Sequence, residues 1–164
     1  MRDDLSNRVI EAGSGGLDVA GFDDRERAVL ATIDEVVVDA GTVRPADAVD
    51  PYVDHPYLAV SLAGGFAPAQ PDDVDRSTLR ELVRRGHLVV RDGIHFHPET
   101  IAAAAEVAAR LLRSDPQGFT VAQFRDATGA SRKYALPLVA ELDARGVTRR
   151  RDDLRIAGPR LPEL

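Results

Sequence analysis

The sequence predicts a mainly α-helical protein with small β-hairpins, and three observations indicate that class. Apolar residues recur at spacings of three and four between stretches that contain glycine or proline, a pattern typical of amphipathic helices. Short β-prone runs flank turns at Asp92-Gly93 and at Asp152-Asp153, as in hairpins. Segments 81–96 and 141–156 match at a constant offset of 60 residues, which predicts two copies of one module. The matched pairs are Glu81/Glu141, Leu82/Leu142, Arg85/Arg145, Gly86/Gly146, Arg91/Arg151 and Asp92/Asp152.

Length and composition limit the class of protein. With 164 residues, 29% charged and 44% hydrophobic, the chain has room for one medium domain or two small ones. It has no 18-residue apolar run and no charged-then-apolar start, so we expect a soluble, cytoplasmic chain that does not enter a membrane. Cysteine is absent, which excludes disulfides and thiol catalysis. Nothing resembles a nucleophile with an oriented base, so we predict no enzymatic activity and no cofactor.

The net charge of −6 is unevenly distributed. Residues 1–98 carry 10 basic and 18 acidic groups, whereas residues 99–164 carry 11 and 9. Because phosphate binding needs local positive potential, only the C-terminal part is a candidate for contact with nucleic acid. An ordinary solvated, arginine-rich surface is the alternative interpretation of this modest excess.

The N-terminal third is predicted as a lead followed by a long helix. Residues 1–22 contain several glycines with little periodicity, and we expect a flexible lead or the remnant of a preceding domain. A helix is predicted from a cap at Asp23 or Asp24 to a stop at Gly41. Its apolar stripe consists of Val29, Leu30, Ile33, Val36, Val37 and Ala40.

Residues 23–98 are predicted to form the first module, with a supporting role. Residues 42–75, rich in proline, glycine and aspartate, are expected to hold a short helix at 46–49 and then a long loop. Ser77 is predicted to cap a third helix that ends at Gly86. A hairpin of 88–91 and 94–97 follows.

Residues 99–164 are predicted to form the second module. A helix at 98–113 joins the modules, a short helix at 121–128 is capped by Thr120, and a third helix covers 132–145. Ser131 is the expected cap of the third helix, whose core face is assigned to Leu136, Val139 and Leu142. Pro137 lies within that helix and should bend its axis.

Helix, short helix, helix and hairpin is the order of a winged helix, so the prediction is a tandem winged-helix protein. In this fold the start of the third helix and the hairpin, or wing, are the usual contact surfaces. The wing also differs between the copies, because the first has Val89 and Val90 where the second has Arg149 and Arg150. The predicted RNA-binding residues are Arg125, Ser131, Arg132, Lys133, Tyr134, Arg149, Arg150, Arg151 and Arg155.

These residue types suit a folded RNA with exposed loop nucleotides. Arginine forks match phosphate oxygens and base edges, and aromatic or guanidinium planes stack on unpaired bases. Tyr134 is predicted either to stack on a base or to pack against the core, and the helix amides near Ser131 add affinity for anions. Arg125 and Arg155 are expected to contribute positive potential.

Two other functions remain open at this point. A double-stranded DNA regulator would use the same fold as a symmetric dimer and read the major groove with helix 132–145. A protein-binding scaffold would use the acidic first module and the alanine-rich helix. A zinc site at His87, His95 and His97 lacks a carboxylate partner, and Asp72, Asp73 and Asp75 lack EF-hand spacing, so we predict no metal.

The second module also resembles a known family. The segments FTVAQFRD, SRKYALPL and LDARGVTRRRDD are similar to the last winged helix of the bacterial selenocysteine-specific translation elongation factor (SelB), and LVRRGHLVVRDGIHFHPE is similar to the module before it. The resemblance implies a monomer that binds the selenocysteine-insertion (SECIS) hairpin of selenoprotein mRNA, and that reaches the ribosome and selenocysteyl-tRNA through other domains. The GTP-binding loop GxxxxGK[ST] does not occur, so we expect a fragment or a separately encoded tail.

Overall fold

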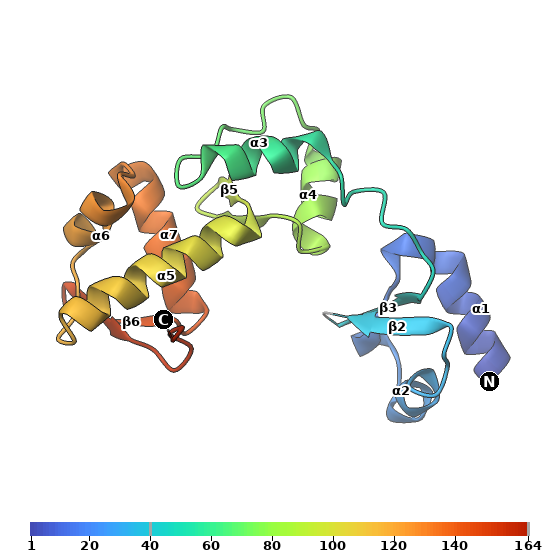
Figure 1. The fold of residues 1–164 in the computed structure, drawn as a ribbon. Coiled ribbons are helices and arrows are strands. Elements are labelled where there is room, and N and C mark those ends of the chain that lie inside the picture. The colour runs from blue at the N-terminus through green and yellow to red at the C-terminus, as the bar shows by residue number, and fades with distance from the viewer. Residues whose placement is uncertain (40, 164) are drawn as a thin grey trace. The chain divides into compact units, whose positions relative to one another are not determined.

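The computed structural model describes residues 1–39 and 41–163, and the chain divides into two units, Met1–Val53 and Asp54–Leu164 (Figure 1). Each unit has its own cluster of buried apolar side chains. The predicted repeat lies entirely in the second unit.

The first unit combines helices with a small antiparallel sheet. Leu5 and Val9, one turn apart on the first helix, are fully buried, and they pack in one cluster with Phe22, Leu30 and Val43. The strand order in the sheet is β1-β3-β2. The elements are α1 (Arg2–Ala12), η1 (Gly13–Gly15), β1 (Leu17–Asp18), η2 (Val19–Gly21), α2 (Asp24–Leu30), β2 (Val36–Asp39) and β3 (Thr42–Pro45), where η marks a 3-10 helix.

This unit differs from the sequence-based expectation. Residues 1–22 are not a flexible lead, because α1 and the short elements after it belong to a folded unit. The glycines in this segment had suggested irregular chain. The helix predicted from Asp23 begins with a capping box but ends at Leu30, and the run Val36–Asp39 is a strand. Three consecutive valines, with Gly41 three residues after the last of them, favour a hairpin over a helix. Ala40 lies outside the described residues, and the short helix predicted at 46–49 is a turn followed by irregular chain.

The second unit begins with a module that we call the first module (residues 54–97). It consists of α3 (Pro56–Gly64), α4 (Arg76–Arg84), β4 (Val89–Arg91) and β5 (Ile94–Phe96). The helix α3 was not predicted; Pro56 takes its first position, and Tyr57 fastens the following loop by donating a hydrogen bond to the carbonyl of Ala69 at 2.7 Å.

The cap of α4 is Asp75 rather than the predicted Ser77. The Asp75 carboxylate accepts hydrogen bonds from the side chains and amides of Ser77 and Thr78, and these bonds hold the pKa of Asp75 well below its usual range. The true module therefore starts after residue 53, and its first helix is α3 rather than the predicted helix near residue 23.

The second module (residues 98–163) follows the predicted order closely. It consists of α5 (Pro98–Ser114), α6 (Val121–Thr128), α7 (Arg132–Ala144), β6 (Thr148–Arg151) and β7 (Leu154–Ala157). The predicted helices 98–113, 121–128 and 132–145 are confirmed to within one residue. Pro137 is buried inside α7, and the bend expected there stays a prediction.

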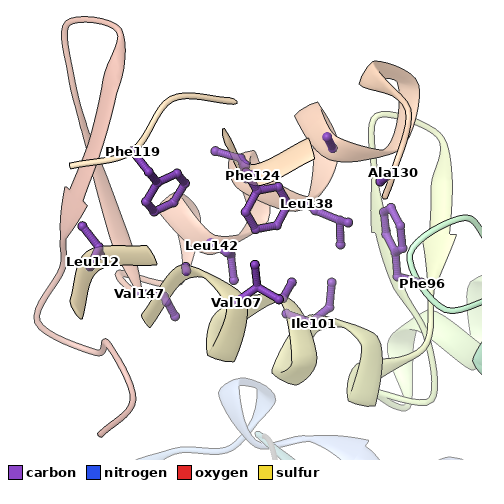
Figure 2. Close-up of a cluster of buried hydrophobic side chains, with 14 of the residues drawn as sticks. Phe96, Ile101, Val107, Leu112, Phe119, Phe124, Ala130, Leu138, Leu142 and Val147 are labelled. Carbon is purple, nitrogen blue, oxygen red and sulfur yellow. The ribbon is translucent and has the colours of Figure 1, made fainter. Parts of the chain in front are cut away.

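The core of the second unit lies between α5, α6 and α7 (Figure 2). Phe119 and Phe124 are almost fully buried, and their ring centroids are 6.0 Å apart. Ile94 and Phe96 of β5 belong to the same cluster, so the wing of the first module packs into the core of the second. The two modules therefore share one hydrophobic core.

The face of α7 that enters this core differs by one position from the prediction. Leu136 is 37% exposed, whereas Ala135, Leu138, Val139 and Leu142 are fully buried. These four residues follow the helical spacing of three and four. Alanine is only weakly hydrophobic, so the sequence analysis assigned the larger Leu136 to the core face in place of Ala135.

An ion triad centred on the buried Glu141 also connects the modules. The Glu141 carboxylate accepts hydrogen bonds from Arg145 on its own helix at 2.8 Å and from Arg91 of β4 at 2.7 Å. Burial alone would raise the pKa of Glu141, but the bonds from Arg145 and Arg91 bring it below its usual value. The equivalent Glu81 pairs with Arg85 and with Arg84 of its own helix, with no connection to another module among its described ion pairs.

The repeat extends to the pairing of the strands. Val90 pairs with His95 in the first wing, and Arg150 pairs with Arg155 at the equivalent position of the second. The first turn residue has a positive φ in both hairpins, 51° at Asp92 and 54° at Asp152. The matching letters in the sequence thus correspond to matching backbone geometry.

Candidate nucleic-acid interface

Local signals place α6 and the start of α7 side by side on one face of the second module. Thr120 and Gln123 form a capping box at the start of α6, and Gly129 ends the helix in the left-handed conformation with φ 69°. Two residues later Ser131 occupies the N-cap of α7, but its side chain makes no capping hydrogen bond. The Ser131 hydroxyl therefore does not occupy the first amides of α7, where anions are favoured.

The wing is fastened to α7 by Asp143. Its carboxylate accepts a hydrogen bond from the Thr148 hydroxyl at 2.6 Å and one from Arg155 Nε at 3.1 Å, so it contacts both strands of the hairpin. The Arg155 side chain is only 12% exposed. Arg155 thus acts mainly as a structural support of the wing, rather than as the freely exposed cation that the sequence suggested.

A groove of about 400 Å³ lies between the start of α6, the start of α7 and the wing, and we call it the α7 groove. It is lined by Thr120, Val121, Ala122, Arg132, Leu136, Arg150, Asp153 and Arg155. Three of the predicted site residues, Arg132, Arg150 and Arg155, therefore meet at one place.

The three consecutive arginines of the wing point in two directions. Side chains alternate along a strand, and Arg150 lines the α7 groove together with its cross-strand partner Arg155. Arg149 and Arg151 consequently lie on the opposite face of the hairpin. Arg150 Nε donates to the carbonyl of Asp152 at 3.0 Å, which holds its guanidinium near the turn.

The other predicted residues lie around the groove without lining it. Arg125 is exposed on α6 and Lys133 is exposed at the start of α7. The Lys133 ammonium lies 5.2 Å from the ring centroid of Tyr134, in cation-π contact. Tyr134 packs against the core, so of its two predicted roles the structure favours packing over stacking on a base.

The sequence analysis did not predict a role in this groove for four of its lining residues, which are Leu136, Thr120, Val121 and Ala122. A signal for Leu136 was present, since a leucine one position away from a regular buried stripe falls on the exposed side of a helix. No sequence pattern marked the start of α6 as part of a groove, because that proximity depends on tertiary packing.

Two of the three histidines considered for a metal site have a defined environment in the structure. His97 caps α5 by accepting a hydrogen bond from the amide of Glu99 at 3.1 Å. His95 has a buried Nδ1 without a hydrogen-bond partner, and burial lowers its pKa. Among residues 1–39 and 41–163, no group of three or more acidic or histidine side chains could hold a metal ion. The same residues contain no helix long and apolar enough to span a bilayer.

Comparison with known proteins gives one family match in this region. A sequence profile described as "Elongation factor SelB, winged helix" matches residues 110–157, which contain the whole α7 groove. The C-terminal region of the chain is thus similar in sequence to the SelB winged helix. The family match therefore confirms the resemblance carried by the segments at 119–156.

Two solved structures of elongation factors are similar to the chain. The mRNA-binding domain of elongation factor SelB from E. coli in complex with SECIS RNA is 27% identical with a TM-score of 0.46, over 51% of this chain and 69% of that chain. The bacterial selenocysteine-specific elongation factor EF-Sec is 14% identical with a TM-score of 0.54, over 95% of this chain. The second likeness is one of fold, and the chain spans 29% of the EF-Sec chain. No curated protein matches the sequence.

Proposed function

We propose that this chain binds an RNA hairpin through its C-terminal SelB winged helix, and that it acts by binding alone. The observation that carries the proposal is the α7 groove, where Arg132 of α7 and Arg150 of the wing meet beside the start of a helix. The groove lies within the segment that matches the SelB winged helix. Positive side chains on one concave surface, beside the start of a helix that has no side-chain cap, suit phosphate oxygens.

The groove combines charge with apolar surface. Leu136 and Val121 line it next to the arginines. An unpaired base presents an apolar face and polar edges, whereas the backbone of a regular duplex presents mainly phosphate and sugar. This composition supports a looped or bulged RNA over a continuous DNA duplex.

The target that we propose is the SECIS hairpin of selenoprotein mRNA. Bound there, the second module would hold a selenocysteine-specific elongation factor beside an in-frame UGA codon, with the first module as spacer and support. Contacts with the ribosome and with selenocysteyl-tRNA, and any GTP hydrolysis, would belong to the rest of that factor. The ion triad at Glu141 supports this division of labour, because it fastens the second module to its neighbour.

The test is a fluorescence anisotropy titration of the full chain with a SECIS hairpin, a loop-scrambled copy and the matching DNA duplex. We expect the intact hairpin to bind most tightly. Arg150→Ala and Arg132→Ala should each weaken binding by about 1 to 3 kcal/mol, and should reduce the slope of log affinity against log salt by about one.

Arg110→Ala is the matched control, since Arg110 is an exposed arginine of the same module that does not line the groove. Its affinity should stay close to that of the wild type. Equal binding of all three nucleic acids, or unchanged binding in both groove variants, would contradict the proposal. Preferential binding of the DNA duplex would instead support a DNA regulator.

A further inference from the structure

The first module contains a groove at the place equivalent to the α7 groove, and we call it the α4 groove. It has a volume of about 550 Å³ and lies between α4 and the wing β4–β5. Its lining residues are Arg76, Leu79, Arg80, Val83, Arg84, Val90 and His95. The two grooves thus lie on corresponding surfaces of the repeated module.

The floor of the α4 groove is apolar. Leu79 and Val83 lie one turn apart on α4 and are partly exposed, and Val90 on the wing is 41% exposed. His95 pairs with Val90 across the hairpin, and burial lowers its pKa, so it adds no charge at neutral pH. In the second module the positions of Val83, Val90 and His95 carry Asp143, Arg150 and Arg155. The first copy therefore lacks the polar floor of the second.

One edge of the α4 groove is basic. Arg76, Arg80 and Arg84 recur every four residues, which places them along one side of a helix over about 12 Å. Arg84 is paired with Glu81 at 2.9 Å. Within the described residues, Arg76 and Arg80 form no ion pair, and the nearby Asp75 carboxylate is engaged by Ser77 and Thr78. Two arginines on this edge thus have positive charge to offer a partner.

We propose that the α4 groove binds a short acidic, amphipathic helix of a partner protein. Apolar side chains at helical spacing would occupy the floor formed by Leu79, Val83 and Val90, and carboxylates beside them would pair with Arg76 and Arg80. Arginine is enriched at protein–protein interfaces, and a groove-bound amphipathic helix buries its apolar face. The missing wing arginines disfavour RNA at this surface, because Val90 and His95 offer no positive charge to phosphate where the second module has Arg150 and Arg155.

The test uses the full chain and a fluorescein-labelled helical peptide that carries leucines at positions i, i+4 and i+7 flanked by glutamates. Fluorescence anisotropy gives the affinity, and backbone amide chemical shifts give the location. We expect saturable binding with shifts confined to α4 and β4–β5. Arg80→Glu and Val90→Glu should each weaken this binding at least about tenfold, which corresponds to roughly 1.4 kcal/mol.

Two further probes decide between kinds of partner. A matched peptide with lysines in place of the glutamates should bind poorly to the wild type and better to Arg80→Glu, since the substitution reverses the charge of the edge. Arg150→Glu, in the other groove, should leave both peptides unaffected. Three results would overturn the proposal: no shifts in α4 and β4–β5, binding insensitive to both variants, or stronger shifts of the same residues with a uridine oligonucleotide.

Discussion

The two modules of the second unit share their hairpin geometry but differ in the surface that the hairpin presents. In the first wing Val90 lies opposite His95, and in the second Arg150 lies opposite Arg155, with the same pairing and the same positive φ at the turn. Among the residues common to both copies, Leu82 and Leu142 are fully buried. Buried positions thus maintain the fold, while exposed wing positions were free to acquire a different ligand.

The modules also differ in how they are held. The second has its own three-helix core, whereas the first contributes Ile94 and Phe96 to that core and depends on it. Glu141 adds an electrostatic connection to the other module, whereas the ion pairs described for Glu81 stay within its own module. From this asymmetry we expect the second module to stabilise the first.

Removal of equivalent core leucines should produce the largest effect. Leu142→Ala and Leu82→Ala each delete a fully buried side chain, and each should lower the free energy of unfolding by about 2 to 5 kcal/mol. Because Leu142 belongs to the shared core, the two modules of Leu142→Ala should unfold together in urea. The chain has no tryptophan, so circular dichroism and amide chemical shifts would follow the unfolding.

The exposed Leu62 of α3 provides the control, and Leu62→Ala should change stability by no more than about 0.5 kcal/mol. If the amides of β4–β5 kept their native shifts after the second module of Leu142→Ala had unfolded, the modules would be independent and the comparison would need revision.

The two equivalent glutamates should differ in their effect on stability. Glu141→Ala leaves Arg91 and Arg145 without their buried partner, and we expect a loss of about 1 to 3 kcal/mol, below the value for a fully buried pair because both arginines are partly exposed. Glu81→Ala removes a more exposed pair and should cost about 0.2 to 1 kcal/mol. Urea unfolding of both variants measures the difference, and equal losses would show that Glu141 does not connect the modules.

The two glutamates, Glu141 and Glu81, should also affect how stability depends on pH. The pKa of Glu141 in the folded chain lies below the usual 4.5, so its stabilising contribution is complete above pH 4.5 and is lost as the pH falls through the folded value. Glu141→Gln should therefore lose stability less steeply than the wild type below pH 4.5. Glu81, whose pKa is lowered to about 2, titrates in the same direction, but high salt should abolish the effect of Glu81→Gln and leave that of Glu141→Gln.

The second module was predictable because its local signals agree with one another. Thr120 caps α6, Gly129 ends it, and the apolar spacing of α7 is regular apart from one position. Each of these signals acts over a few residues, and the structure satisfies all of them. The tandem fold and the wing were predicted from similar local signals, together with the internal repeat.

The errors arose where distant contacts or weak signals decide the structure. No local pattern indicates that Arg91 bonds Glu141, 50 residues away, or that Arg155 pairs with Asp143 of α7. In the first unit the valines of β2 lie on a spacing that also fits a helix, and only pairing with β3 selects the strand. Sequence reasoning thus located the basic surface but could not predict which face of the hairpin each arginine occupies.

The smallest effect concerns the turns of the two wings. Asp152 adopts φ 54°, which a residue with a Cβ rarely does, and glycine adopts it without steric cost. Asp152→Gly should therefore raise the free energy of unfolding by about 0.5 kcal/mol, with part of the gain offset by the greater freedom of glycine in the unfolded chain. The bond from Arg150 Nε to the carbonyl of residue 152 does not need a side chain there and should persist.

Asp152→Ala separates backbone conformation from side-chain chemistry, because alanine keeps the Cβ but loses the carboxylate. Thermal unfolding should rank the variants with glycine above aspartate and aspartate above alanine, and the same order should hold at Asp92, whose φ is 51°. If glycine were as destabilising as alanine at Asp152 alone, the carboxylate rather than the backbone would hold that turn. The wings would then differ in their turns as well as in their surfaces, and the position of Arg150 would depend on a feature that the first module does not share.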